Sequence, residues 1–94
     1  MRVDVEFLGL SRLVTGLRET TLELEDGTTY RDIVRRLGET YPALIGNVIQ
    51  SDGETLQAPN ILNLGARQMI QASQMGKSAS DGDRLILMSM SAGG

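Results

Sequence analysis

The sequence contains no cysteine and no histidine. Without cysteine, disulfides, thiolate nucleophiles, iron–sulfur ligation and thiolate zinc sites are excluded. Without histidine, the chain lacks the most common metal ligand in proteins and the most common general base at neutral pH. We therefore expect no bound metal ion and no bound cofactor, and the composition argues against a self-contained hydrolase or metalloenzyme.

Aromatic residues and clusters of positive charge are also scarce. The chain has one Phe, two Tyr and no Trp, so its core must be built mainly from Val, Leu, Ile and Met. The nine basic residues are scattered and the net charge is −3, unlike a nucleic-acid-binding surface. No apolar run approaches the length of a membrane span, and the charged, alternating N-terminus does not resemble a signal peptide. We expect a cytoplasmic protein that binds neither nucleic acid nor membranes.

The length of 94 residues predicts a single compact domain over residues 1–94. Apolar and charged residues alternate over residues 2–8 and again over residues 20–25, which predicts two half-buried strands. Gly9 and Gly16 bracket the segment between them, which we interpret as a connecting loop. Asp26-Gly27 is typical of a turn that ends the second strand.

The hydrophobic period then changes to that of a helix. We predict a helix over residues 29–40, with Thr28 as a plausible N-cap and Pro42 stopping it. Asp32 and Arg36 are spaced as an i, i+4 ion pair on the exposed side. The apolar positions at helical spacing are Tyr30, Ile33, Val34, Leu37 and Tyr41.

The second half of the chain supplies further strands. Residues 43–50 fit either a short helix or a strand, residues 60–64 predict a short strand, and residues 67–71 allow another. A turn at residues 81–83, Asp-Gly-Asp, precedes a final strand at residues 84–90. Asp81 and Asp83 could pair as an acid–base site, but Asp-Gly favours the turn interpretation. The order of elements indicates an α+β fold of the β-grasp type, with one main helix on one face of a mixed sheet.

The final strand carries apolar residues on both faces. Leu85 and Leu87 share one face, and Ile86, Met88 and Met90 share the other. Either both faces are buried, or Leu85 and Leu87 face the core while the other three residues form an exposed patch. Exposed apolar patches mark partner-binding sites, and methionine adapts to more than one partner surface.

The tail that follows is Ser91-Ala92-Gly93-Gly94. It can be a frayed end of small residues, as many termini are. Alternatively, its near absence of side chains suits insertion into a narrow channel, with the terminal carboxylate as the reactive group.

Together, the β-grasp order, the Asp-Gly-Asp turn and the terminal Gly-Gly resemble the MoaD/ThiS family of ubiquitin-like sulfur carriers. The resemblance implies that a ubiquitin-activating-like enzyme adenylates the Gly94 carboxylate with ATP, and that a thiocarboxylate then forms there. The partner-binding residues would be Gly93, Ala92, Ser91, Met90, Met88 and Ile86.

Two features depart from the family pattern. Prolines often precede the tail in the family, whereas this chain has Ser89-Met90-Ser91, which should make the tail less stiff. An Asn-Gly turn often follows the third strand, whereas this chain has Asn63-Leu64-Gly65.

The resemblance leads us to expect a noncatalytic sulfur carrier. Molybdopterin synthesis is the leading pathway, with the large subunit of molybdopterin synthase as the acceptor enzyme. Cysteine or thiamin biosynthesis remains open, as does a ubiquitin-like modifier attached to proteins through Gly94. A third class is a β-grasp binding domain without terminal chemistry.

Overall fold

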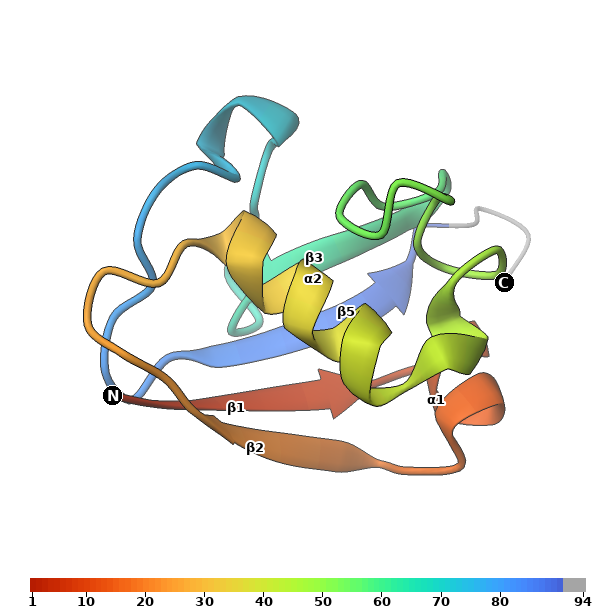
Figure 1. The fold of residues 1–94 in the computed structure, drawn as a ribbon, viewed down its shortest axis with the longest axis horizontal. Helices are drawn as coiled ribbons and strands as arrows, with labels where there is room; N and C mark the ends of the chain where they lie inside the picture. Colours follow the sequence, from red (N-terminus) through yellow and green to blue (C-terminus); the bar gives the residue numbers. More distant parts are fainter. Residues whose placement is uncertain (91–94) are drawn as a thin grey trace.

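The computed structural model describes residues 1–90 and shows a five-stranded mixed sheet crossed by one main helix (Figure 1). The strand order is β2-β1-β5-β3-β4. The first and last strands, β1 and β5, pair in parallel at the centre, and the other neighbours are antiparallel. This arrangement confirms the predicted β-grasp fold. The strands are β1 (Arg2–Phe7), β2 (Glu19–Glu23), β3 (Asn60–Leu64), β4 (Gln68–Met69) and β5 (Arg84–Ser89).

The main helix α2 (Tyr30–Thr40) begins with a capping box at Thr29. The Asp32 amide donates to Thr29 Oγ1 at 3.1 Å, and the Thr29 amide donates to Asp32 Oδ2 at 3.2 Å. The prediction of Thr28 as the N-cap was wrong, because the Thr28 hydroxyl donates to the Glu25 carbonyl in the preceding turn. The predicted ion pair between Asp32 and Arg36 does not form, because Asp32 pairs instead with Arg35, with 3.2 Å between Asp32 Oδ1 and Arg35 Nη1.

The segment between β1 and β2 is the short helix α1 (Leu10–Thr15), so the prediction of a loop was wrong. Gly9 and Gly16 bracket this helix as its caps. Gly16 has a φ of 72°, a left-handed conformation that glycine adopts without steric cost, and its amide donates to the Arg12 carbonyl. Ser11 is buried and donates from Oγ to the Leu87 carbonyl at 2.7 Å, which ties α1 to β5.

The ambiguous segment at residues 43–50 begins with the 3₁₀ helix η1 (Pro42–Leu44). Its apolar character reflects burial, because Leu44, Val48 and Ile49 are all inaccessible to solvent. The strand allowed at residues 67–71 is limited to the two residues of β4, and the 3₁₀ helix η2 (Ala72–Gln74) follows.

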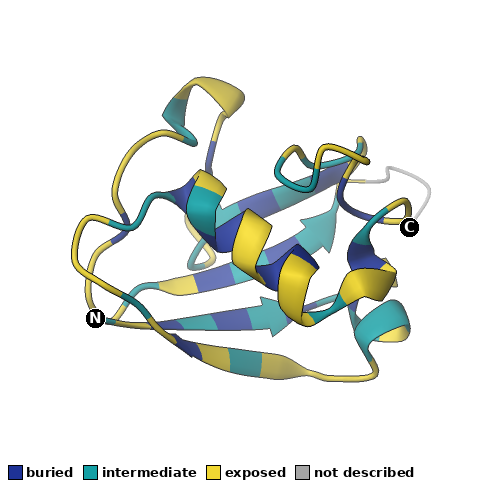
Figure 2. Cartoon of the chain, in the orientation of Figure 1, coloured by how far each residue is buried: buried dark blue, intermediate teal, exposed yellow. Residues whose placement is uncertain are grey.

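The core lies between the sheet and α2, and within residues 1–90 no helix covers the opposite face of the sheet (Figure 2). The Phe7 ring meets Tyr41 edge-on, with centroids 5.7 Å apart. Within residues 1–90, none of the helices has the length and apolar character of a membrane span. The fully buried sheet and helix residues include Val3, Val5, Phe7, Leu62, Leu85, Leu87, Ile33 and Leu37.

Candidate functional site

The central strand β5 presents different environments on its two faces. Leu85 and Leu87 are fully buried against the core, as predicted. Ile86 and Met88 are half-buried on the opposite face, and Met90 beyond the strand is 60% exposed. The alternative in which both faces are buried is therefore wrong.

Neighbouring strands enlarge this apolar surface. Met88 lies opposite Ile61 in the antiparallel register of β5 and β3, and Ile86 lies opposite Asn63. Asn63 in turn lies opposite Met69 of β4. Directly opposed residues share a face of the sheet, so these side chains form one surface. We call it the β3–β5 patch, and its apolar members are Ile61, Met69, Ile86, Met88 and Met90.

Ile61 and Met69 were not predicted as site residues. Their positions depend on the register between strands, which the hydrophobic pattern of a single strand does not contain. The hairpin that sets this register turns at Gly65, whose φ is 61°. The Gly65 amide donates to the Arg84 carbonyl at 2.7 Å, which fixes the turn to the start of β5.

Asn63 is a polar side chain within the patch. Its Nδ2 donates to Met88 Sδ at 3.5 Å, and its buried Oδ1 has no hydrogen-bond partner among the described residues. A buried acceptor without a partner is destabilising. Asn63 therefore contacts Met88 through its Nδ2 and keeps an unsatisfied acceptor in Oδ1.

The other half of the open face is charged. Arg84 Nη2 bridges Glu6 on β1 at 3.1 Å and Glu19 on β2 at 3.0 Å. These hydrogen bonds, first to Glu19 and then to Glu6, raise the pKa of Arg84. The open face is thus divided into an apolar part on β3, β4 and the later residues of β5, and an ionic part on β1, β2 and Arg84 at the start of β5.

The Asp-Gly-Asp segment forms a turn that anchors the start of β5, as predicted. Asp81 Oδ1 accepts from the Arg2 amide at 2.7 Å. Asp83 Oδ2 accepts from the Ser80 amide at 2.9 Å and from the Tyr30 hydroxyl at 3.2 Å. Burial, followed by the Asp83 charge, raises the pKa of Tyr30. In the described part of the chain, no cluster of three or more acidic side chains could hold a metal ion.

The predicted reactive and inserting residues Gly94, Gly93, Ala92 and Ser91 lie outside the described residues. Met90 is the last described residue, and its amide donates to the Pro59 carbonyl at 2.9 Å. The strand that carries the patch therefore runs directly toward the segment in which the sequence predicts the chemistry.

The strand order, the crossing helix and the central final strand define a ubiquitin-like β-grasp protein. In sequence, the chain is 30% identical to small archaeal modifier protein 3 of Haloferax volcanii over 94 residues, which is 100% of each chain. No family model matches the chain.

Solved structures support the same fold. Small archaeal modifier protein SAMP1 from Haloferax volcanii superposes with a TM-score of 0.82, with 22% identity and 100% of each chain covered. A putative molybdopterin converting factor, subunit 1, from Pyrococcus furiosus has a TM-score of 0.74, with 18% identity and coverage of 94% and 95%. The chain therefore belongs to the small archaeal modifier family, within the ubiquitin-like MoaD/ThiS class of sulfur carriers and protein modifiers.

Proposed function

We propose that this protein is a sulfur carrier whose reactive group is the carboxylate of Gly94. A ubiquitin-activating-like enzyme uses ATP to convert that carboxylate into an acyl-adenylate. Adenylation is chemically necessary, because a carboxylate is a poor electrophile and the mixed anhydride supplies a good leaving group. Sulfur transfer then releases AMP and leaves a thiocarboxylate, which an acceptor enzyme uses. The chain itself is a cosubstrate and not the catalyst.

The observation that carries the proposal is the connection between β5 and the tail. Ile86, Met88 and Met90 line a solvent-facing apolar surface on the strand that leads into Ser91-Ala92-Gly93-Gly94. A partner that binds the patch would be close in sequence to the reactive carboxylate, because Gly94 is four residues after Met90. Gly93 and Gly94 have no side chains to obstruct a narrow channel.

ATP–pyrophosphate exchange tests the activation step. The full chain is incubated with its activating enzyme, ATP and labelled pyrophosphate, beside a variant that lacks Gly94. We expect exchange with the full chain and its loss with the deletion variant. Equal exchange with both chains would contradict the assignment of Gly94.

Our proposal for the acceptor pathway rests on the family resemblance. We propose molybdopterin synthesis first, with this chain as the small subunit of molybdopterin synthase in the cytoplasm. The similarity of fold to a putative molybdopterin converting factor subunit is consistent with this pathway. To test this pathway, the thiocarboxylated chain is mixed with a molybdopterin synthase large subunit and its pterin substrate. Failure to form molybdopterin would favour cysteine or thiamin biosynthesis.

A second function, attachment to proteins through Gly94, is favoured by the relative at 30% identity, which is named a modifier. Both functions begin with the same adenylation, so they differ only in the acceptor. Adducts that survive reductant on a denaturing gel, and that disappear with the Gly94 deletion, would support the modifier.

A further inference from the structure

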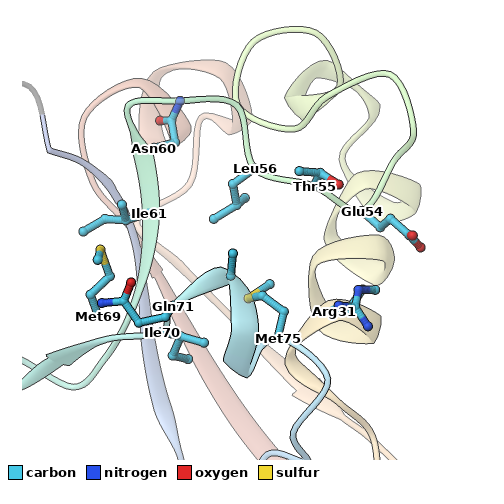
Figure 3. Close-up of a pocket in the computed structure, with 11 residues that line it drawn as sticks. Arg31, Glu54, Thr55, Leu56, Asn60, Ile61, Met69, Ile70, Gln71 and Met75 are labelled. Carbon is cyan, nitrogen blue, oxygen red and sulfur yellow. The ribbon is translucent and has the colours of Figure 1, made fainter.

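A concave groove lies on the helix side of β3, beyond the residues that the proposed function uses (Figure 3). Its volume is about 340 Å³, near the lower end of the range for ligand-binding pockets. Four segments form its walls: the first turn of α2, the loop at residues 54–56, the start of β3, and residues 69–75. Segments distant in sequence therefore converge on one hollow.

The interior of the groove is apolar. Leu56 and Met75 are half-buried, and both project into the hollow, with the more deeply buried Ile70 beneath them (Figure 3). Ile61 and Met69 also line the groove, so it meets the β3–β5 patch at the edge of β3. The groove therefore offers space for an apolar side chain that arrives from a partner.

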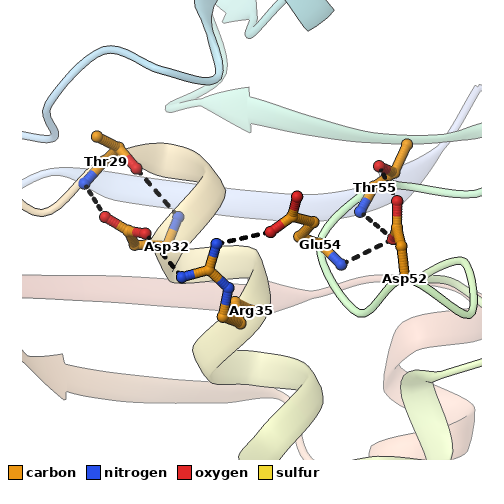
Figure 4. A network of polar contacts seen from close by, with 6 residues as sticks. All are labelled: Thr29, Asp32, Arg35, Asp52, Glu54 and Thr55. Atoms are coloured by element: carbon orange, nitrogen blue, oxygen red, sulfur yellow. Dashed lines mark hydrogen bonds and ion pairs between the residues drawn. The ribbon is translucent and has the colours of Figure 1, made fainter.

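The rim of the groove carries a guanidinium, that of Arg31, outside the ion pairs of the neighbouring side chains. Glu54, the acidic residue on the rim, is already bound, because Arg35 Nη2 lies 2.6 Å from Glu54 Oε2 (Figure 4). Arg35 also forms an ion pair with Asp32, with 3.2 Å between Arg35 Nη1 and Asp32 Oδ1. Arg31, by contrast, is exposed on the rim and makes no ion pair with any described residue. A negative charge on the ligand would complement the Arg31 guanidinium.

The backbone of β3 at the groove has one carbonyl, that of Asn60, without a partner strand among residues 1–90. The Ile70 amide donates to the Leu62 carbonyl, and β4 pairs with β3 from there toward the hairpin. The Met90 amide donates to the Pro59 carbonyl on the β5 side of the strand. Successive carbonyls of a strand point to opposite sides, so the next one, that of Asn60, points away from β5. It lies on the edge that β4 leaves uncovered, where it can accept a hydrogen bond from an extended chain.

We propose that this groove binds an extended segment of a partner protein that carries an apolar side chain next to a carboxylate. The apolar side chain packs against Leu56, Ile70 and Met75. The carboxylate pairs with Arg31, and a backbone amide of the segment donates to the Asn60 carbonyl. The residues that line the groove do not include Ile86, Met88 or Met90, so it is a second recognition surface that goes beyond the proposed function.

An NMR titration of the full ¹⁵N-labelled chain tests this site. The probe is the acetylated and amidated peptide Gly-Leu-Asp-Leu-Gly, and the control peptide has Asn in place of Asp. We expect the Asp peptide to shift the amide signals of Ile70 and Met75. We expect the Asn peptide to bind about threefold more weakly, because an ion pair with an exposed guanidinium contributes up to about 1 kcal/mol.

Two substitutions on the exposed side of α2 test whether the Arg31 guanidinium is the group that binds the carboxylate of the peptide. Arg31→Gln should weaken binding of the Asp peptide about threefold and remove its advantage over the Asn peptide. Arg36→Gln removes the same charge from an exposed position of the same helix outside the groove, and binding should not change. The proposal is overturned if the Asp peptide causes no shifts, if the shifts lie on the β3–β5 patch alone, or if Arg31→Gln binds like the unaltered chain.

Discussion

Ile61 on β3 and Met88 on β5 lie directly opposite each other in antiparallel register, on the face of the sheet that α2 does not cover. The pair extends the apolar surface of β5 across to the neighbouring strand. Both side chains are half-buried, so they retain accessible surface for a partner. Residues of three strands therefore form the β3–β5 patch, although the sequence pattern indicates only the residues of β5.

Met88→Asp should abolish activation while the fold is retained. The charge would have to be desolvated when a partner covers the patch, whereas in the free chain it remains in contact with water. Adenylation kinetics with the activating enzyme measure the effect, and circular dichroism monitors the fold. Met88→Leu is the matched control and should keep near-normal kinetics, because it preserves an apolar side chain. Unchanged adenylation in Met88→Asp would contradict a docking role for the patch.

Leu87→Ala should lower the free energy of unfolding by about 2–5 kcal/mol, the range for truncating a buried leucine. Leu87 is fully buried, and its carbonyl also accepts hydrogen bonds from Ser11 and Leu8. Urea denaturation measures the change. Met90→Ala, at a position that is 60% exposed, should stay within about 0.5 kcal/mol of the unaltered chain. Equal effects at the two positions would contradict the assigned burial.

Thr29→Ala should destabilise the protein by about 1 kcal/mol, because it removes the side-chain acceptor at the N-terminus of α2. Thr40→Ala, at the exposed last residue of the same helix, is the matched control and should have little effect. Thermal and urea denaturation of both variants measure the difference. If Thr40→Ala were the more damaging change, the observed capping box would not contribute to stability.

Stability should fall as the pH drops below about 4, the range in which the carboxyl of Asp ordinarily titrates. The hydrogen bonds from the Thr29 amide and then from its side chain, with the charge of Arg35, lower the pKa of Asp32. A lowered folded-state pKa stabilises the protein above the unfolded-state pKa, and this contribution is lost as the pH falls through the folded-state value. Asp32→Asn should therefore lose less stability on acidification. Parallel pH profiles for both chains, measured by urea denaturation, would refute this linkage.

The sequence predicts most of the fold because its strands and main helix have clear periods. The alternation at Val3, Val5 and Phe7, and the helical spacing from Tyr30 to Leu37, correspond to buried faces in the structure. The short helix α1 was missed, because six residues span too few turns to show a period. Gly16 was the available signal, since glycine commonly follows the end of a helix.

The candidate site is only partly predictable in the same way. Alternation identifies Leu85 and Leu87 as core residues once one face of β5 is known to be buried. The contributions of Ile61 and Met69 depend on the register between strands. Beside the groove, the ion pair of Arg35 depends on the position of Glu54, 19 residues further along the chain. Contacts of this kind arise from tertiary packing and leave no local pattern in the sequence.

The most direct test of the sulfur-carrier function is the intact mass of the full chain after incubation with its activating enzyme, ATP and a sulfur source. We predict a gain equal to the mass difference between sulfur and oxygen, and no such gain in the variant that lacks Gly94. An unchanged mass, with an activating enzyme proven competent on another carrier, would contradict the proposal that Gly94 carries sulfur.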